Sequence, residues 1–129
     1  NKSVLPYLLG ASVGLSGMFY VVVSQVEWTN MLLILIFCSH ASSGVNWVYS
    51  TTMLQARSDD EWRGRVAGTD FLVITFMMGS SALGAALILE NNILELREVI
   101  AITGIIQIAI GICWTIFISP SEKMDLMLN

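Results

Sequence analysis

Charged side chains are scarce in this sequence. Only 12% of its 129 residues are charged, against 55% that are hydrophobic. A soluble domain needs a charged surface, so this balance argues for lipid as the main solvent of the chain. Lys and Arg together number six and the formal net charge is −4. A chain with few basic residues and a negative net charge is poorly suited to bind nucleic acid, so we expect no nucleic-acid partner.

Residues that bind metals or form disulfides are also rare. Cys38 and Cys113 lie in separate apolar runs without a CxxC motif, and His40 is the one histidine. We therefore expect two buried thiols that pack as small hydrophobic groups, with no metal and no cofactor. The sequence has no nucleophile elbow, HExxH motif, phosphate-binding glycine loop or intramembrane carboxylate pair, so an enzyme is not expected.

Four long apolar runs organise the chain. Each has 20 to 24 residues and at most one ionisable side chain, which is His40 in the second run and Asp70 in the third. At about 1.5 Å per helical residue, such a run crosses the roughly 30 Å hydrocarbon core of a bilayer. The sequence thus predicts an all-α integral membrane protein with four transmembrane helices. The predicted helices are 4–24, 31–54, 66–89 and 99–119, with a central loop at 55–65.

The first run has an alternative interpretation as a signal peptide, because Lys2 precedes it. Its length, Pro6 near its start and the lack of a clear A-x-A cleavage site favour a membrane helix. Since the first residue is Asn1, we also expect the chain to begin inside a longer reading frame.

The basic residues predict an orientation. Five of the six lie before the first helix, in the central loop or after the fourth helix, and four helices place these three regions on one side. Because basic segments stay in the cytoplasm, we expect both termini and the central loop to be cytoplasmic, in the plasma (inner) membrane. Arg97 and Trp28, an interfacial anchor, then fall in outer loops. The five residues are Lys2, Arg57, Arg63, Arg65 and Lys123.

Small residues recur at a spacing of four along two of the predicted helices. Gly10-x-x-x-Gly14 lies in the first, and Ser80-x-x-x-Gly84 lies in the third. Such spacings let backbones approach closely in lipid, so they predict packing faces rather than a ligand site. Gln107 in the fourth helix is expected to hydrogen-bond to another helix, with a transport role as the alternative.

The second predicted helix carries a polar stripe. At about 100° per residue, six polar or aromatic residues fall within one third of its circumference. They are Ser39, His40, Ser43, Asn46, Trp47 and Ser50. Polar groups at membrane depth need either a water-filled cavity or a helix interface in which they hydrogen-bond. The Asn and Trp favour the cavity, which makes His40, Ser43, Asn46, Trp47 and Ser50 candidate substrate-path residues.

The central loop combines both signs of charge. Ser58 with Glu61 three residues later matches a capping box, so a short helix is predicted to begin there. Gly64 is expected to let the chain turn tightly before the third helix. One interpretation is a solvated loop whose arginines bind lipid phosphates. The alternative interpretation is a cytoplasmic latch, in which ion pairs hold the ends of helices together. Its residues would be Arg63, Gly64, Arg65 and Asp70.

Asp70 is the one carboxylate inside a predicted helix. Arg65 lies about 140° away around that helix, and Arg63 lies two turns off on the same face. We therefore expect the partner of Asp70 on another helix. A structural latch is the leading role, followed by proton coupling and by simple exposure at the lipid interface.

The central loop resembles a loop of known membrane transporters. Leu54-Gln55, followed by Asp60-Glu61-Trp62-Arg63-Gly64-Arg65-Val66, is similar to the loop between the tenth and eleventh helices of major facilitator superfamily transporters. The efflux branch with enterobactin exporters and macrolide efflux pumps is the most similar. Asp59 stands where that branch usually has Pro, and Trp62 where it has Leu. The resemblance implies helices nine to twelve of a twelve-helix transporter, with the eight preceding helices as partners.

The expected function is therefore secondary active transport. The resemblance implies alternating access, proton coupling as an antiporter and a substrate site near the midplane between two halves. The cargo would be an amphipathic small molecule such as a drug or a siderophore. Two alternatives stay open: a small four-helix membrane scaffold or assembly subunit, and a transporter of lysophospholipids.

Overall fold

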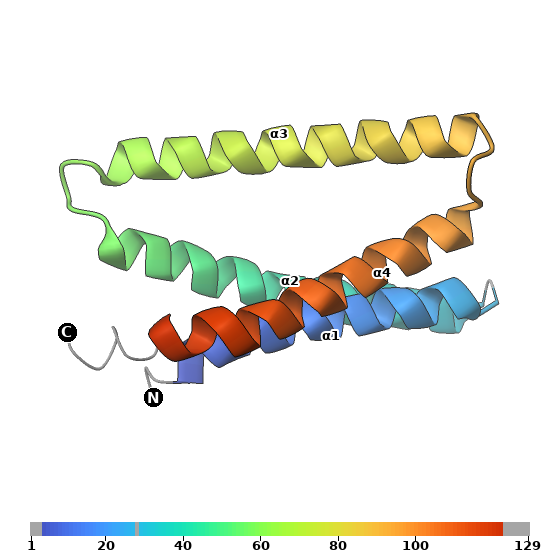
Figure 1. Ribbon diagram of the computed structural model, residues 1–129, viewed down its shortest axis with the longest axis horizontal. Coiled ribbons are helices and arrows are strands. Elements are labelled where there is room, and N and C mark those ends of the chain that lie inside the picture. Colours follow the sequence, from blue (N-terminus) through green and yellow to red (C-terminus); the bar gives the residue numbers. More distant parts are fainter. Residues whose placement is uncertain (1–3, 28, 123–129) are drawn as a thin grey trace.

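The computed structural model describes residues 4–27 and 29–122, and all of its regular elements are helices. They are α1 (Leu5–Gln25), α2 (Asn30–Arg57), α3 (Arg63–Glu90), α4 (Leu96–Cys113) and the π-helix η2 (Trp114–Ile118) (Figure 1). The last two form one continuous helix that runs from Leu96 to Glu122. Four helices are long and apolar enough to cross a bilayer, so the predicted all-α fold with four helices is confirmed. Lys2, Trp28 and Lys123 lie outside the described residues.

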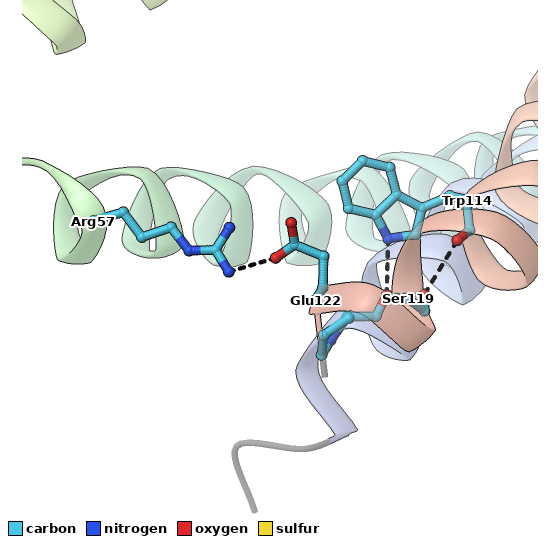
Figure 2. A network of polar contacts seen from close by, with 5 residues as sticks. Arg57, Trp114, Ser119 and Glu122 are labelled. Carbon is cyan, nitrogen blue, oxygen red and sulfur yellow. Dashed lines mark hydrogen bonds and ion pairs between the residues drawn. The ribbon is translucent and has the colours of Figure 1, made fainter. Parts of the chain in front are cut away.

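Successive helices run in opposite directions, which gives the structure two distinct ends. The start of α1, the 58–62 connection and the end of the fourth helix share one end (Figure 1). At this end, an ion pair between Arg57 and Glu122 joins the end of α2 to the end of the fourth helix (Figure 2). At the other end, Arg97 of α4 donates a hydrogen bond to the backbone oxygen of Ser24 in α1 (3.2 Å). Arg57 and Arg97 therefore lie at opposite ends, as the basic-residue pattern requires.

Helix α1 is the centre of the packing, with α2 on one side and α4 on the other. Glycines bring α1 and α4 into backbone contact. A Cβ added to Gly10 would lie 2.9 Å from the backbone oxygen of Gly111, and one added to Gly17 would lie 2.6 Å from that of Gly104. The antiparallel helices thus meet at two glycine pairs, each seven residues from the other along its helix. The Gly10-x-x-x-Gly14 pattern marked this face of α1 correctly, whereas the sequence analysis missed Gly104 and Gly111.

Helix α3 stands apart from this three-helix group (Figure 1). None of its residues is buried, and its contacts within the chain are few and go chiefly to α2. The small-residue face at Ser80 and Gly84 packs against nothing, since a Cβ added to Gly84 would meet no atom within 4 Å. The packing predicted for this face is not formed within the described residues.

A proline shapes the end of the fourth helix. Pro120 lacks the N–H that an α-helix needs, and its ring would clash with the carbonyl of Ile116. The wider turn of η2 precedes it, with the Ser119 N–H bonded to the oxygen of Trp114. The Trp114 indole N–H and the Ser119 hydroxyl each donate to the backbone oxygen of Pro6 at 3.0 Å. These bonds tie the fourth helix to the first turn of α1.

The connection between α2 and α3 is shorter than the predicted 55–65, because both helices extend into it. Ser58 does not begin a helix with Glu61, so the capping-box prediction is wrong. Its hydroxyl instead donates to the backbone oxygen of Leu54 (2.7 Å) at the end of α2. Gly64 makes no tight turn either: it lies in the first turn of α3, and no described glycine has a positive φ.

A capping contact does occur at the start of α4. The backbone N–H of Glu95 donates to the Glu98 carboxylate (2.8 Å), which satisfies a donor that the helix leaves free. The sequence analysis missed it because the residue at the cap is Glu rather than Ser or Thr. Of the two cysteines, Cys38 is half-buried and Cys113 is exposed, and both are free thiols. The expectation of a buried thiol is therefore wrong for Cys113.

Candidate functional site

The polar stripe on α2 divides between two environments. Ser39 and Ser16 of α1 are each only 1% exposed, and their hydroxyl oxygens lie 3.0 Å apart. The Ser16 hydroxyl also lies 3.2 Å from that of Ser43. One edge of the stripe is therefore a hydrogen-bonded interface with α1, which satisfies these hydroxyls without water. Of the two environments that the sequence allowed, a water-filled cavity and a helix interface, this edge of the stripe occupies the helix interface.

In the described part of the chain, the other residues of the stripe make no hydrogen bond to α1, and they differ in exposure. His40 is exposed, and its Nδ1 donates to the backbone oxygen of Ile36 (3.0 Å), which requires the ring proton on Nδ1. Ser50 is exposed and its hydroxyl donates to the backbone oxygen of Trp47 (3.2 Å). Asn46 is half-buried, and the Trp47 side chain is 48% exposed. Of the predicted path residues, His40, Trp47 and Ser50 are exposed and Asn46 is half-buried, while the Ser43 hydroxyl lies at the interface with α1.

A pocket of about 150 Å³ lies between α2 and α3, near the 58–62 connection. On each helix its lining residues recur at spacings of three and four, so each set occupies one helical face. From α2 and its C-cap these residues are Trp47, Thr51, Leu54, Gln55 and Ser58; from α3 they are Arg63, Val66, Ala67, Asp70 and Phe71. The pocket thus brings together Trp47 of the predicted path with Arg63 and Asp70 of the predicted latch.

The cations at this end of the helices have partners other than Asp70. Arg63 donates to the Asp60 carboxylate at 2.7 Å and to the backbone oxygen of Ser58 at 3.4 Å. The Arg65 guanidinium lies 4.9 Å from the centre of the Trp62 ring, within cation–π range. In the part of the chain that the structure describes, neither an ion pair nor a hydrogen bond reaches Asp70. The half-buried Asp70 carboxylate in the pocket therefore has no cationic partner among the described residues.

The sequence analysis did not assign Gln55, Ser58 or Phe71 to a site, although it named Gln55 in the loop resemblance and Ser58 in the predicted capping box. Gln55, Ser58 and Phe71 line the pocket, and the spacing of Phe71 from Arg63 is the signal that could have placed it there. Gln107 was expected to hydrogen-bond to another helix, and its side-chain oxygen instead has no partner within the described residues. That oxygen is buried where α4 meets α1, since the Gln107 Cβ lies next to Gly17.

Comparison of the chain with family models, with curated proteins and with solved structures gives no match. Within residues 4–27 and 29–122, no group of three or more His, Cys, Asp or Glu side chains is placed to hold a metal ion. The site is therefore defined by its own geometry. It is an apolar pocket between two membrane helices, with aromatic side chains, one unpaired carboxylate and an arginine paired elsewhere.

Proposed function

We propose that this membrane-embedded, multi-pass chain is part of a secondary active transporter of the major facilitator type. It exports amphipathic small molecules by alternating access, with proton coupling. The 58–62 connection faces the cytoplasm of a cell bounded by the plasma (inner) membrane, and both termini lie on the same side. The remaining helices of the transporter belong to the same polypeptide.

The isolation of α3 is the observation that carries this proposal. A helix of 28 residues with no buried residue and with an uncovered small-residue face has formed only part of its packing. In lipid, close approach at small residues is what associates helices, so such a face favours a further helix against it. The α2–α3 pocket opens beside α3, which supports a substrate path bordered by helices from elsewhere in the protein.

The side chains take two roles in this proposal. Ser43 lies at the boundary of the path with α1, and the other path residues are His40, Asn46, Trp47 and Ser50. At the cytoplasmic end, Arg63, Gly64, Arg65 and Asp70 form the latch. The Arg63–Asp60 pair holds one conformer, and transfer of Arg63 to Asp70, on the same face of α3, holds another.

Flux measurements test the proposal. The whole gene product, reconstituted into vesicles, should show saturable drug or siderophore flux driven by a proton gradient. Residues 1–129 alone should show none, because one wall of the path is missing. Asp70→Asn should abolish flux at every pH with normal expression, while Glu90→Gln, an exposed change at the other end of α3, should retain it. Saturable flux from residues 1–129 alone would overturn the proposal that the chain is part of a larger transporter.

A scaffold or assembly subunit is the second candidate, because the exposed face of α3 can also pack against a separate membrane protein. Absence of flux for drugs, siderophores and lysophospholipids, together with α3-dependent copurification of a membrane partner, would establish it. Flux of lysophospholipids alone would retain transport and change the cargo.

A further inference from the structure

We infer that the α2–α3 pocket binds the ammonium group of an amphipathic amine, with Asp70 as its counter-charge and Trp47 and Phe71 as its aromatic walls. The inference shares Trp47 with the proposed transport path and to that extent rests on the proposed function. Binding is measured without flux, however, so either proposal can fail while the other stands.

The charge of the pocket favours a cation. Two charged side chains line the pocket, Asp70 and Arg63, and Asp60, which pairs with Arg63, lies outside it and is 90% exposed. Arg63 is held by Asp60 and by the backbone of Ser58, which leaves the Asp70 carboxylate uncompensated. A half-buried carboxylate gains most from an opposite charge that approaches it directly. The Asp70 carboxylate, which has no partner among the described residues, therefore favours a cation with a single charge.

The walls of the pocket decide which kind of cation fits. Besides Trp47 and Phe71, their apolar part is made by Leu54, Val66 and Ala67. Aromatic faces attract organic ammonium groups, whose charge is spread over apolar substituents. A metal ion would instead need several oxygen ligands, and among the described residues no group of three or more His, Cys, Asp or Glu side chains is placed to hold one. The chemistry is that of a substituted ammonium group.

The volume restricts the ligand further. About 150 Å³ is well below the roughly 300–1,000 Å³ of pockets that enclose drug-sized molecules. The pocket therefore takes a head group and leaves the apolar remainder of the ligand in the lipid beside α3. Asp70 lies about 10 Å inside the start of α3, so a head group can enter from the membrane–water interface. Two sources supply this chemistry: a free amphipathic amine and the headgroup of phosphatidylethanolamine.

Equilibrium dialysis of radiolabelled choline tests the site. The whole gene product is placed in nanodiscs of phosphatidylglycerol, which carries no ammonium group. Saturable binding should be displaced by excess tetramethylammonium, and should resist the neutral isostere of choline in which tert-butyl replaces trimethylammonium. Equal displacement by both competitors would overturn the inference, and this comparison needs no variant to fold.

Variants then assign the residues. Asp70→Asn should weaken choline binding about tenfold, since it removes the charge and keeps the shape. Trp47→Leu should weaken it by about three- to tenfold. Glu90→Gln, an acidic change at the far end of the same helix, should leave it unchanged. Unaltered binding in a folded Asp70→Asn protein would overturn the inference.

Arg63 separates a cation site from an anion site. Arg63→Gln should strengthen choline binding, because a competing cation leaves the pocket. Asp60→Asn should weaken it, because the released Arg63 then turns to Asp70. The reverse pair of effects would show that the pocket recognises anions through Arg63. Nanodiscs that contain phosphatidylethanolamine identify the source: lost choline binding indicates a lipid headgroup, and retained binding indicates a free amine.

Discussion

Gly17 and Gly104 lie against each other where α1 crosses α4. A Cβ at either position would come within 2.7 Å of the backbone oxygen of the other glycine. Because both atoms at the contact belong to backbones, no side-chain rotation can relieve the overlap. The distance between these two helices is therefore set by the absence of side chains at this pair and at Gly10 and Gly111.

Gly104→Ala should separate α1 from α4 and destabilise the fold by about 1–3 kcal/mol, the usual cost of overpacking. Unfolding in mixed micelles with increasing denaturing detergent measures this free energy. Gly68→Ala in α3 is the matched control, because a Cβ there meets no atom within 4 Å. Alanine also favours the helix over glycine by about 1 kcal/mol, so the control should be neutral or stabilising. Equal losses in both variants would contradict the glycine contact.

Removal of the Ser16 hydroxyl, through which α1 hydrogen-bonds to α2, should weaken the contact between these helices. Ser16→Ala is expected to cost about 0.6 kcal/mol, the average for hydrogen bonds between membrane helices, and at most about 1.7 kcal/mol. Ser39→Ala should cost less, since Ser16 keeps Ser43 as a partner. Ser50→Ala is the control, because its exposed hydroxyl bonds only within its own helix. The same unfolding assay ranks the three, and a loss for Ser50→Ala as large as for Ser16→Ala would refute the assignment.

The buried and exposed parts of the polar stripe on α2 should differ in the rate at which cysteines placed there react with a thiol reagent. In a background without Cys38 and Cys113, cysteines at His40 and Ser50 should react quickly with a small aqueous thiol reagent. A cysteine at Ser39 should react slowly, because α1 covers that position. Cysteines at Val45 and Val48 should also react slowly, because they face lipid in the proposed arrangement. Fast reaction at Ser39 would mean that water enters between α1 and α2.

The two connections that flank α3 should lie on opposite sides of the membrane, because successive helices run in opposite directions. Cysteines at Glu61 and Asn91 are both exposed and should be labelled by an impermeant thiol reagent from opposite sides of the membrane. Asn91 is preferred to Asn92, which has a positive φ of 51° that a cysteine would adopt only with strain. Labelling of both from one side would exclude the four-span topology.

The sequence predicted the class of fold well and the candidate site only in part. Long uncharged runs leave a helix as the one way to satisfy the backbone in lipid, so four spans follow directly from composition. The site combined Trp47, which the stripe had marked, with Arg63 and Asp70, which the loop resemblance and the intramembrane charge had marked. Phe71 was not marked, because an apolar residue in an apolar helix carries no signal of its own.

The sequence alone determined the number of spans, because a backbone in lipid must form helices to satisfy its hydrogen bonds. It also placed Arg57 and Arg97 at opposite ends, because one span separates them. Only the tertiary structure decided which faces meet. It turned Ser39 toward Ser16, matched Gly17 with Gly104 and left α3 uncovered. In lipid, helix association depends on how closely two particular backbones approach and on which donors they align, and the periodicity of one helix does not encode its partner.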